Sequence, residues 1–128
     1  MVTGVQCLKT AIGVDIIEID RIKRAVFRWQ DSFLNRIYTQ AELEETGNMS
    51  SLAARFAAKE AVMKALGTGF RDIGWKDIEI VNTENGAPSV RLYGRAAHKS
   101  QELGLARFEV SLSHSRKYAI AMVMAHAE

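Results

Sequence analysis

The chain has 128 residues, of which 48% are hydrophobic and 25% charged, and a formal net charge of +2. This balance is typical of an ordinary globular domain, and so small a net charge does not favour nucleic-acid binding. Cys7 is the only cysteine, which excludes an internal disulfide, and no apolar run approaches the ~20 residues of a membrane-spanning helix. Met1–Lys9 lacks the charged start and apolar centre of a signal peptide. We therefore expect one domain over residues 1–128, cytoplasmic and with neither nucleic acid nor membrane as a partner.

The first predicted element is a strand over Thr10–Ile19, which is rich in β-branched residues and apolar on both faces. Asp15 is conspicuous there because it shares a face with Ile17 and Ile19, so a carboxylate enters an apolar layer. Asp15 is either a strand-end residue that accepts backbone hydrogen bonds or a member of a site, and spacing alone leaves both open.

A helical period follows from Asp20, which is well placed to cap the helix. One face is apolar and consists of Ile22, Ala25, Val26 and Trp29. Another face is basic and carries Arg21, Arg24 and Arg28 at spacings of three and four. We call these three residues the arginine stripe. A solvated surface is the usual meaning of such a stripe, and a docking surface for an acidic partner is the alternative.

Two short helices are predicted next. Phe33–Tyr38 continues the helical pattern, and Thr39 with Glu42 forms a capping box for a helix over Gln40–Glu45. Gly47 and Asn48 end it.

The central prediction is an alanine-rich helix over Ser51–Leu66 with Gly67 as its left-handed stop. Apolar arcs lie on opposite sides of this helix, which predicts burial on both sides. Four charged residues lie in the seams between the arcs: Arg55, Lys59, Glu60 and Lys64. Glu60 and Lys64 have the spacing of an internal ion pair, but four charges on one buried helix favour a site for an anion and possibly a metal.

The rest of the chain reads as two hairpins around a helix. Ile78–Val81 and Val90–Tyr93 are strands with Asn85-Gly86 as the turn signal and Pro88 at a strand start. Arg95–Leu103 is a helix closed by Gly104. Phe108–His114 and Tyr118–Ala125 form the last hairpin, whose second strand is almost wholly apolar and therefore central. The fold class is α+β, a mainly antiparallel sheet with helices packed on one side.

His114 has two interpretations. It continues the apolar face of Phe108, Val110 and Leu112, as a satisfied core histidine would. It also lies in a cluster of hydroxyls and cations that suits a phosphate group; the cluster includes Ser111, Ser113, Ser115, Arg116 and Lys117. Gly67-Thr68-Gly69 is not a P-loop, and neither a dinucleotide fingerprint nor a serine nucleophile elbow is present.

Three segments together closely resemble holo-acyl-carrier-protein synthase, the short class of the 4′-phosphopantetheinyl transferases. They are Ile12–Ile19, Arg55–Ala61 with Lys64–Gly69, and Val110–His114. The resemblance extends from about Ala11 to Ala125, with further matches at Trp75–Glu79 and Asn85–Pro88. It implies transfer of the phosphopantetheine arm of coenzyme A to a serine of apo-acyl carrier protein, with release of adenosine 3′,5′-bisphosphate. It also implies a Mg²⁺ requirement and a homotrimer with sites between subunits.

The resemblance assigns roles residue by residue. Asp15 and Glu60 are the metal ligands and, with Lys64, the catalytic residues; Glu60 is also a possible base. The expected coenzyme A contacts are Arg55, Lys59, Gly67, Asn85, Gly86, Pro88, Ser113, His114 and Ser115, although Arg55 and Lys59 have neighbouring carboxylates as alternative partners. The expected carrier contacts are Arg21, Arg24, Arg28 and Arg36. Ser32 departs from the family, which often has a basic residue before the phenylalanine at Phe33, and this weakens the expectation of strong carrier docking.

Two other functions compete with this one. A non-catalytic module that binds a carrier protein or a nucleotide would keep the arginine stripe and the His114 turn but would not need both Asp15 and Glu60. Another Mg²⁺-dependent phosphotransferase is a weaker alternative.

Overall fold

The computed structural model describes residues 9–128, so the signal-peptide prediction for Met1–Lys9 falls almost entirely on residues outside the described part. Its strands are β1 (Thr10–Glu18), β2 (Ile78–Asn82), β3 (Pro88–Leu92), β4 (Arg107–His114) and β5 (Tyr118–His126). Its helices are α2 (Ile19–Trp29), α3 (Asp31–Ile37), α4 (Gln40–Glu45), α5 (Met49–Ala65) and α6 (Gly94–Leu103), with a 3₁₀ turn η1 (Trp75–Asp77). None of these helices is long and apolar enough to cross a bilayer.

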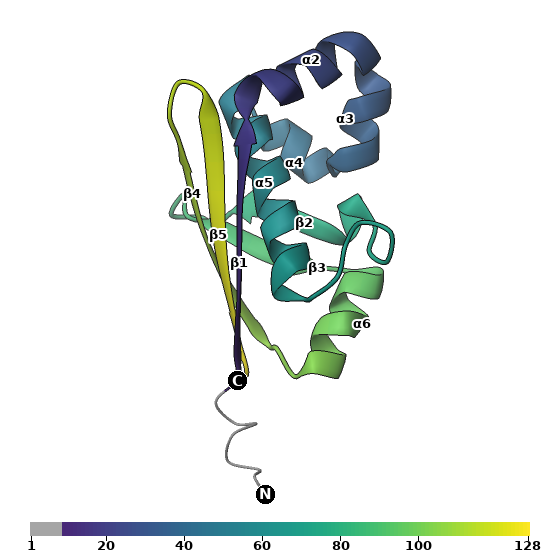
Figure 1. Cartoon of the computed structure of the whole chain (residues 1–128), viewed down its shortest axis with the longest axis vertical. Helices are drawn as coiled ribbons and strands as arrows, with labels where there is room; N and C mark the ends of the chain where they lie inside the picture. The colour runs from purple at the N-terminus through teal and green to yellow at the C-terminus, as the bar shows by residue number, and fades with distance from the viewer. Residues whose placement is uncertain (1–8) are drawn as a thin grey trace, which may run out of the picture.

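The main sheet is antiparallel with the strand order β1-β5-β4, and this confirms the prediction that the last strand is central. Along β5, small side chains alternate toward the interior, and all of them are fully buried: Ala119, Ala121, Val123 and Ala125. Small residues there allow a helix to approach the sheet closely. The helices lie on one side of this sheet, as predicted (Figure 1).

Helix α5 lies against the inner face of the main sheet and is buried on nearly all sides, as its two apolar arcs predict. It begins two residues earlier than expected because the Asn48 side chain accepts a hydrogen bond from Ser51 N at 2.9 Å and caps it. Gly67 follows with a φ of 70°, the left-handed conformation expected of a helix stop. Gly13 of β1 faces α5 so closely that a Cβ there would lie 1.8 Å from the Ala61 carbonyl oxygen.

The second sheet consists of β2 and β3 alone and is the predicted hairpin. Gly86 has a φ of 88° in its turn, and Pro88 begins β3. Since only β3 pairs with β2, the other edge of β2 needs hydrogen-bond partners from elsewhere in the chain.

The helices before α5 differ from expectation at one end. α2 begins at Ile19 without a side-chain cap, so the prediction that Asp20 caps it is wrong; Asp20 lies in the first turn. There a carboxylate still interacts favourably with the helix dipole. Trp29 is 55% exposed, so the apolar face of α2 is shorter than predicted. The capping box of Thr39 and Glu42 on α4 is confirmed.

The outer face of the main sheet, turned away from α5, is apolar and exposed. Its members are 40% to 60% exposed and comprise Ile12, Val14, Ile16, Ile120 and Met122. Ser111 and Ser113 of β4 lie beside Met122 and Ile120 in the ladder. We call these five apolar residues the outer apolar face.

Candidate active site

The predicted catalytic residues come together where α5 crosses β1. Lys64 Nζ donates to Asp15 Oδ1 at 3.1 Å and to the carbonyl oxygen of Val14 at 2.9 Å. Lys64 is more than half exposed, whereas the Asp15 side chain is 12% exposed. Lys64 is therefore paired across to the strand, and the internal Glu60–Lys64 pair considered from the sequence is not among the ion pairs of the described residues.

Glu60 lies one turn before Lys64 and is half-buried in a pocket of about 290 Å³. Burial raises the pKa of Glu60, and the nearby Asp15 carboxylate raises it further, whereas Arg21 and Lys64 oppose the shift. Two carboxylates that repel each other in this way form an environment that favours either a bound cation or a proton on one of them.

The pocket combines this acid with cations and aromatic rings. Its lining residues are Arg21, Phe33, Arg36, Ile37, Phe56, Glu60, Phe70 and Trp75. The Trp75 ring stacks on Phe56 with centroids 4.8 Å apart and on Phe70 with centroids 5.9 Å apart. We call these three rings the aromatic wall. Sequence reasoning missed the wall because its members come from separate segments, and no local pattern brings them together.

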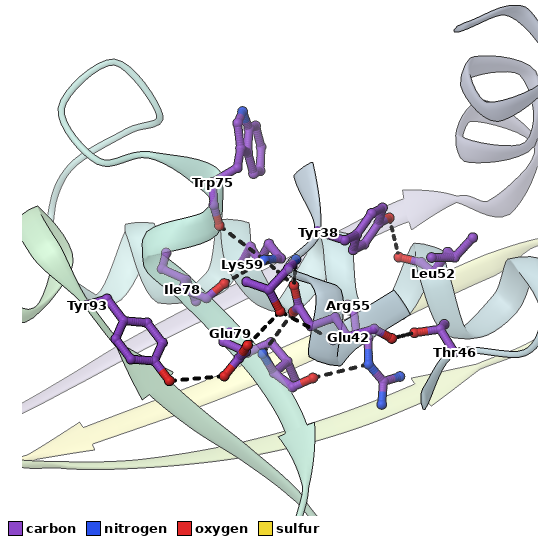
Figure 2. A network of polar contacts seen from close by, with 12 residues as sticks. Tyr38, Glu42, Thr46, Leu52, Arg55, Lys59, Trp75, Ile78, Glu79 and Tyr93 are labelled. Atoms are coloured by element: carbon purple, nitrogen blue, oxygen red, sulfur yellow. Dashed lines mark hydrogen bonds and ion pairs between the residues drawn. The ribbon is translucent and has the colours of Figure 1, made fainter. Parts of the chain in front are cut away.

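Arg55 and Lys59 lie elsewhere, in the interior network of Figure 2. Lys59 is fully buried, and its Nζ donates to Glu42 Oε1 at 2.7 Å and to the carbonyl oxygens of Trp75 and Ile78 at 3.0 and 2.5 Å. Burial lowers the pKa of Lys59, and its pairing with Glu42 opposes that shift. No surface of Lys59 is left for a phosphate, so this arrangement leaves no room for the contact with coenzyme A expected from the sequence.

Arg55 is bound in the same way one turn earlier. Its Nε donates to the carbonyl oxygen of Ile80 at 3.2 Å, and its Nη2 lies 3.3 Å from Glu45 Oε1. The sequence left phosphates and neighbouring carboxylates as alternative partners of Arg55 and Lys59, and the structure pairs both residues with carboxylates. Sequence reasoning missed Glu42 and Glu45 as their partners; the only local signal was the capping box that contains Glu42.

The remaining expected coenzyme A contacts lie at turns and strand ends, with Gly67 exposed after α5 and Pro88 half-buried at the start of β3. Asn85 and Gly86 form the tip of the β2–β3 hairpin, and Ser113, His114 and Ser115 lie where β4 ends. Within residues 9–128, no hydrogen bond or ion pair joins His114 to Asp15, Glu60 or Lys64; the His114 ring contacts the carbonyl oxygen of Ser115 at 3.3 Å. The strand-end position leaves His114 exposed, so the core interpretation of this histidine is wrong.

The arginine stripe is exposed along α2, and Arg21 at its end lines the Glu60 pocket together with Arg36 of α3. Arg28 lies over the Trp29 ring, 4.9 Å from its centroid. The expected carrier surface and the expected chemical centre are thus continuous through Arg21.

Comparison with known proteins bears on what this site does. The family model described as the 4′-phosphopantetheinyl transferase superfamily matches residues 11–123. The chain belongs to this superfamily. The matched segment of this transferase contains every site residue predicted above, from Asp15 to Ser115.

Relatives and solved structures agree with that assignment. A holo-[acyl-carrier-protein] synthase of Dehalococcoides mccartyi is 55% identical over 114 residues, which cover 88% of this chain and 95% of the relative. One of Herpetosiphon aurantiacus is 49% identical over 120 residues, 88% of this chain and 94% of the relative. Among solved structures, the Neisseria meningitidis synthase has a TM-score of 0.81 at 38% identity and covers 91% of this chain and 97% of its own. The Helicobacter pylori synthase in complex with coenzyme A has a TM-score of 0.79 at 33% identity, and the match covers 89% of this chain and 98% of that synthase.

Proposed function

We propose that this transferase moves the 4′-phosphopantetheine arm of coenzyme A to a serine of an apo-acyl carrier protein. Superfamily membership and the synthases that resemble the chain over most of its length support the reaction. The observation that carries it within the chain is the convergence of Asp15, Glu60 and Lys64 where α5 meets β1. A module that only binds a carrier has no need for two mutually repelling carboxylates at that point.

The chain's own residues suit attack on a pyrophosphate, which requires positioning and charge stabilisation more than covalent chemistry. Glu60, with its raised pKa, is the residue that accepts the proton of the attacking serine. Lys64 either breaks its hydrogen bond to Asp15 or keeps it while it also contacts the substrate. In both cases its ammonium stabilises the charge that develops on the departing phosphate.

Asp15 and Glu60 also fit a hard divalent cation such as Mg²⁺. Magnesium commonly takes one or two carboxylates and completes its shell with water and substrate phosphate. Within residues 9–128 no cluster of three or more acidic, histidine or cysteine side chains is present, so the chain offers two carboxylates and no closed cage. When bound, the ion would neutralise the pyrophosphate and relieve the repulsion between the two carboxylates.

The arginine stripe with Arg36 is the proposed carrier-docking surface. Its exposure and its continuity with the Glu60 pocket through Arg21 support docking that places the carrier serine beside Glu60. Acyl carrier proteins are acidic, so charge complementarity steers the encounter.

We further propose that coenzyme A is bound between subunits of a homotrimer, with Ser113, His114 and Ser115 of one chain facing Asp15, Glu60 and Lys64 of the next. The outer apolar face supports self-association, because isolated chains rarely leave so many large apolar side chains together in water. His114 is exposed and, among residues 9–128, shares no hydrogen bond or ion pair with the catalytic residues proposed for its own chain, which fits a role in a neighbour's site. The remaining proposed coenzyme A contacts are the β2–β3 turn with the start of β3 and the end of α5, namely Asn85, Gly86, Pro88 and Gly67. The proposed compartment is the cytoplasm.

The test is a mass measurement. The protein is incubated with apo-carrier, coenzyme A and Mg²⁺, and the carrier is examined for the added phosphopantetheine mass. A binding module would give a stable complex with an unmodified carrier. That result, with a folded protein and a carrier that a second transferase can load, would refute the proposed activity.

A further inference from the structure

Lys59 is a buried cation to which the proposed chemistry gives no task, although it directly precedes Glu60. Its Nζ reaches three segments at once: α4 through Glu42, the η1 turn through the Trp75 carbonyl oxygen, and β2 through the Ile78 carbonyl oxygen. Figure 2 shows the ammonium at the centre of these contacts. No other described side chain of α5 makes hydrogen bonds to three different elements.

The partner of Lys59 is itself held rigidly. Glu42 Oε1 also accepts from Thr39 N at 2.9 Å, and Oε2 accepts from Ile80 N at 2.8 Å. Glu42 and Lys59 therefore satisfy the Ile80 N–H and the Ile78 carbonyl on the free edge of β2, in place of a neighbouring strand. With the carboxylate fixed by two backbone amides, the position of the ammonium is fixed as well.

The contact to Trp75 connects this interior network to the candidate active site. Lys59 holds the backbone carbonyl of Trp75 at 3.0 Å, and the side chain of the same residue is the middle ring of the aromatic wall beside Glu60. A buried ion pair adds little net stability compared with apolar groups of the same volume. The main contribution expected of Lys59 is therefore to fix the positions of the three segments that it joins.

We propose that Lys59 is a positioning residue: its ammonium fixes the η1 turn against α5 and so sets the aromatic wall of the pocket in which Glu60 reacts. This inference rests on the proposed function for its kinetic consequences. Lys59 touches no substrate in this role, and it acts on the reaction only through Trp75. The arginine stripe lies on α2 and makes no hydrogen bond to this network within the described residues, so carrier affinity should depend far less on Lys59 than kcat does.

The first experiment removes the ammonium with Lys59→Met and compares it with Leu105→Ala, a truncation of a buried residue in the loop after α6. The chain has two tryptophans, Trp29 and Trp75. Both variants are made in a Trp29→Phe background, so that all tryptophan fluorescence comes from Trp75. Activity is expressed per folded molecule, measured at a temperature at which each variant is fully folded. Acrylamide quenching of Trp75 fluorescence in the same samples reports the order of the wall.

Lys59→Met is expected to lower kcat by about 10-fold or more, because displacements of about 1 Å near reacting groups have effects of this size or larger. The KM for the carrier should stay within about 3-fold, since rim charges that steer binding are unchanged. Trp75 should become more accessible to acrylamide. Leu105→Ala should lower the melting temperature without changing kcat per folded molecule or Trp75 quenching. If kcat is unchanged in Lys59→Met, or falls equally in both variants, the positioning role is refuted.

A second variant covers the case in which Lys59→Met does not fold. Trp75→Leu keeps the Lys59–Glu42 pair and removes the ring from the wall, so it should reproduce the loss of kcat per folded molecule. A fully active Trp75→Leu enzyme would overturn the proposal whatever Lys59→Met does. Restoration completes the design: Lys59→Cys in a Cys7→Ser background, alkylated in denaturant to an aminoethyl thioether and refolded, should regain kcat relative to the unalkylated variant. If the parent protein is inactive, the proposed function fails, and Trp75 quenching still tests the link between Lys59 and Trp75.

Discussion

Gly13→Ala tests the close approach of β1 to α5 on which the candidate active site depends. The added Cβ would lie 1.8 Å from the Ala61 carbonyl oxygen and 3.0 Å from Ala65 N. Atoms in contact sit about 3.5 Å apart, so strand and helix must separate by about 1.7 Å. The obstacle is the backbone of a buried helix and cannot rotate away, which places the cost near the upper end of overpacking, about 3 kcal/mol. For a domain of this size that corresponds to a melting temperature lower by about 10 °C.

The same displacement should impair catalysis in the molecules that remain folded. Lys64 Nζ and Asp15 Oδ1 lie 3.1 Å apart across this interface, and a separation of the size estimated above breaks their contact. Misplacement on the order of 1 Å lowers rates about 100-fold. Gly47→Ala is the matched control, because a Cβ at Gly47 meets no atom within 4 Å. Thermal unfolding and the carrier mass assay are run on both variants. If Gly13→Ala is as stable and active as Gly47→Ala, then β1 and α5 are not packed as described and the geometry of the site is wrong.

Three further predictions concern charge and assembly. Between its ordinary pKa of 4.5 and its raised value, Glu60 binds more protons in the folded state than in the unfolded state, so the stability of the protein falls as pH rises through that window. Glu60→Gln should therefore have a higher melting temperature than the parent at neutral pH without Mg²⁺. If the melting temperatures differ by the same amount at pH 4, the raised pKa is contradicted. Arg24→Glu should weaken carrier binding far more than coenzyme A binding, and the parent's carrier affinity should fall as salt shortens the Debye length below ~8 Å; equal losses for both substrates would rule out a carrier-specific surface. We expect the variants Glu60→Gln and His114→Ala to be inactive alone and to regain activity only when they are unfolded and refolded together. If mixed trimers form and stay inactive, both residues belong to the site of one chain.

Local patterns in the sequence predicted most of the fold. Alternation and turn residues located both hairpins, with Asn85-Gly86 at one turn and Pro88 at the start of β3. Apolar arcs on both sides of α5 predicted its burial, and the capping box predicted α4 with its bounds. These features succeed because the period of a strand or helix and the chemistry of a cap depend on residues a few positions apart.

The partners of buried charges could not be predicted in the same way. Lys59 finds Glu42, and Arg55 finds Glu45, across 17 and 10 positions of sequence. Only the packing of α4 and β2 against α5 determines those distances. The Gly13 contact with Ala61 is similarly long-range, although a glycine inside a strand is a general signal of close backbone approach.

The charges on α5 divide into two rows of residues four apart, and this division explains why one helix can carry both interior charges and charges that face the pocket. Arg55 and Lys59 form the row that faces β2, where each ammonium or guanidinium is matched by a carboxylate of α4 and a backbone carbonyl. Glu60 and Lys64 form the row, begun by Phe56, that faces the pocket and β1. Neighbouring positions such as 59 and 60 point about 100° apart on a helix, so adjacent charges reach different environments. In the first row both cations are paired and Arg55 alone keeps a little exposed surface, 6%, whereas the second row leaves a carboxylate with a raised pKa beside an exposed cation. The reactive roles proposed for Glu60 and Lys64 therefore rest on exposure, because Lys64 keeps exposed surface although it is paired with Asp15, and Glu60 opens into the pocket.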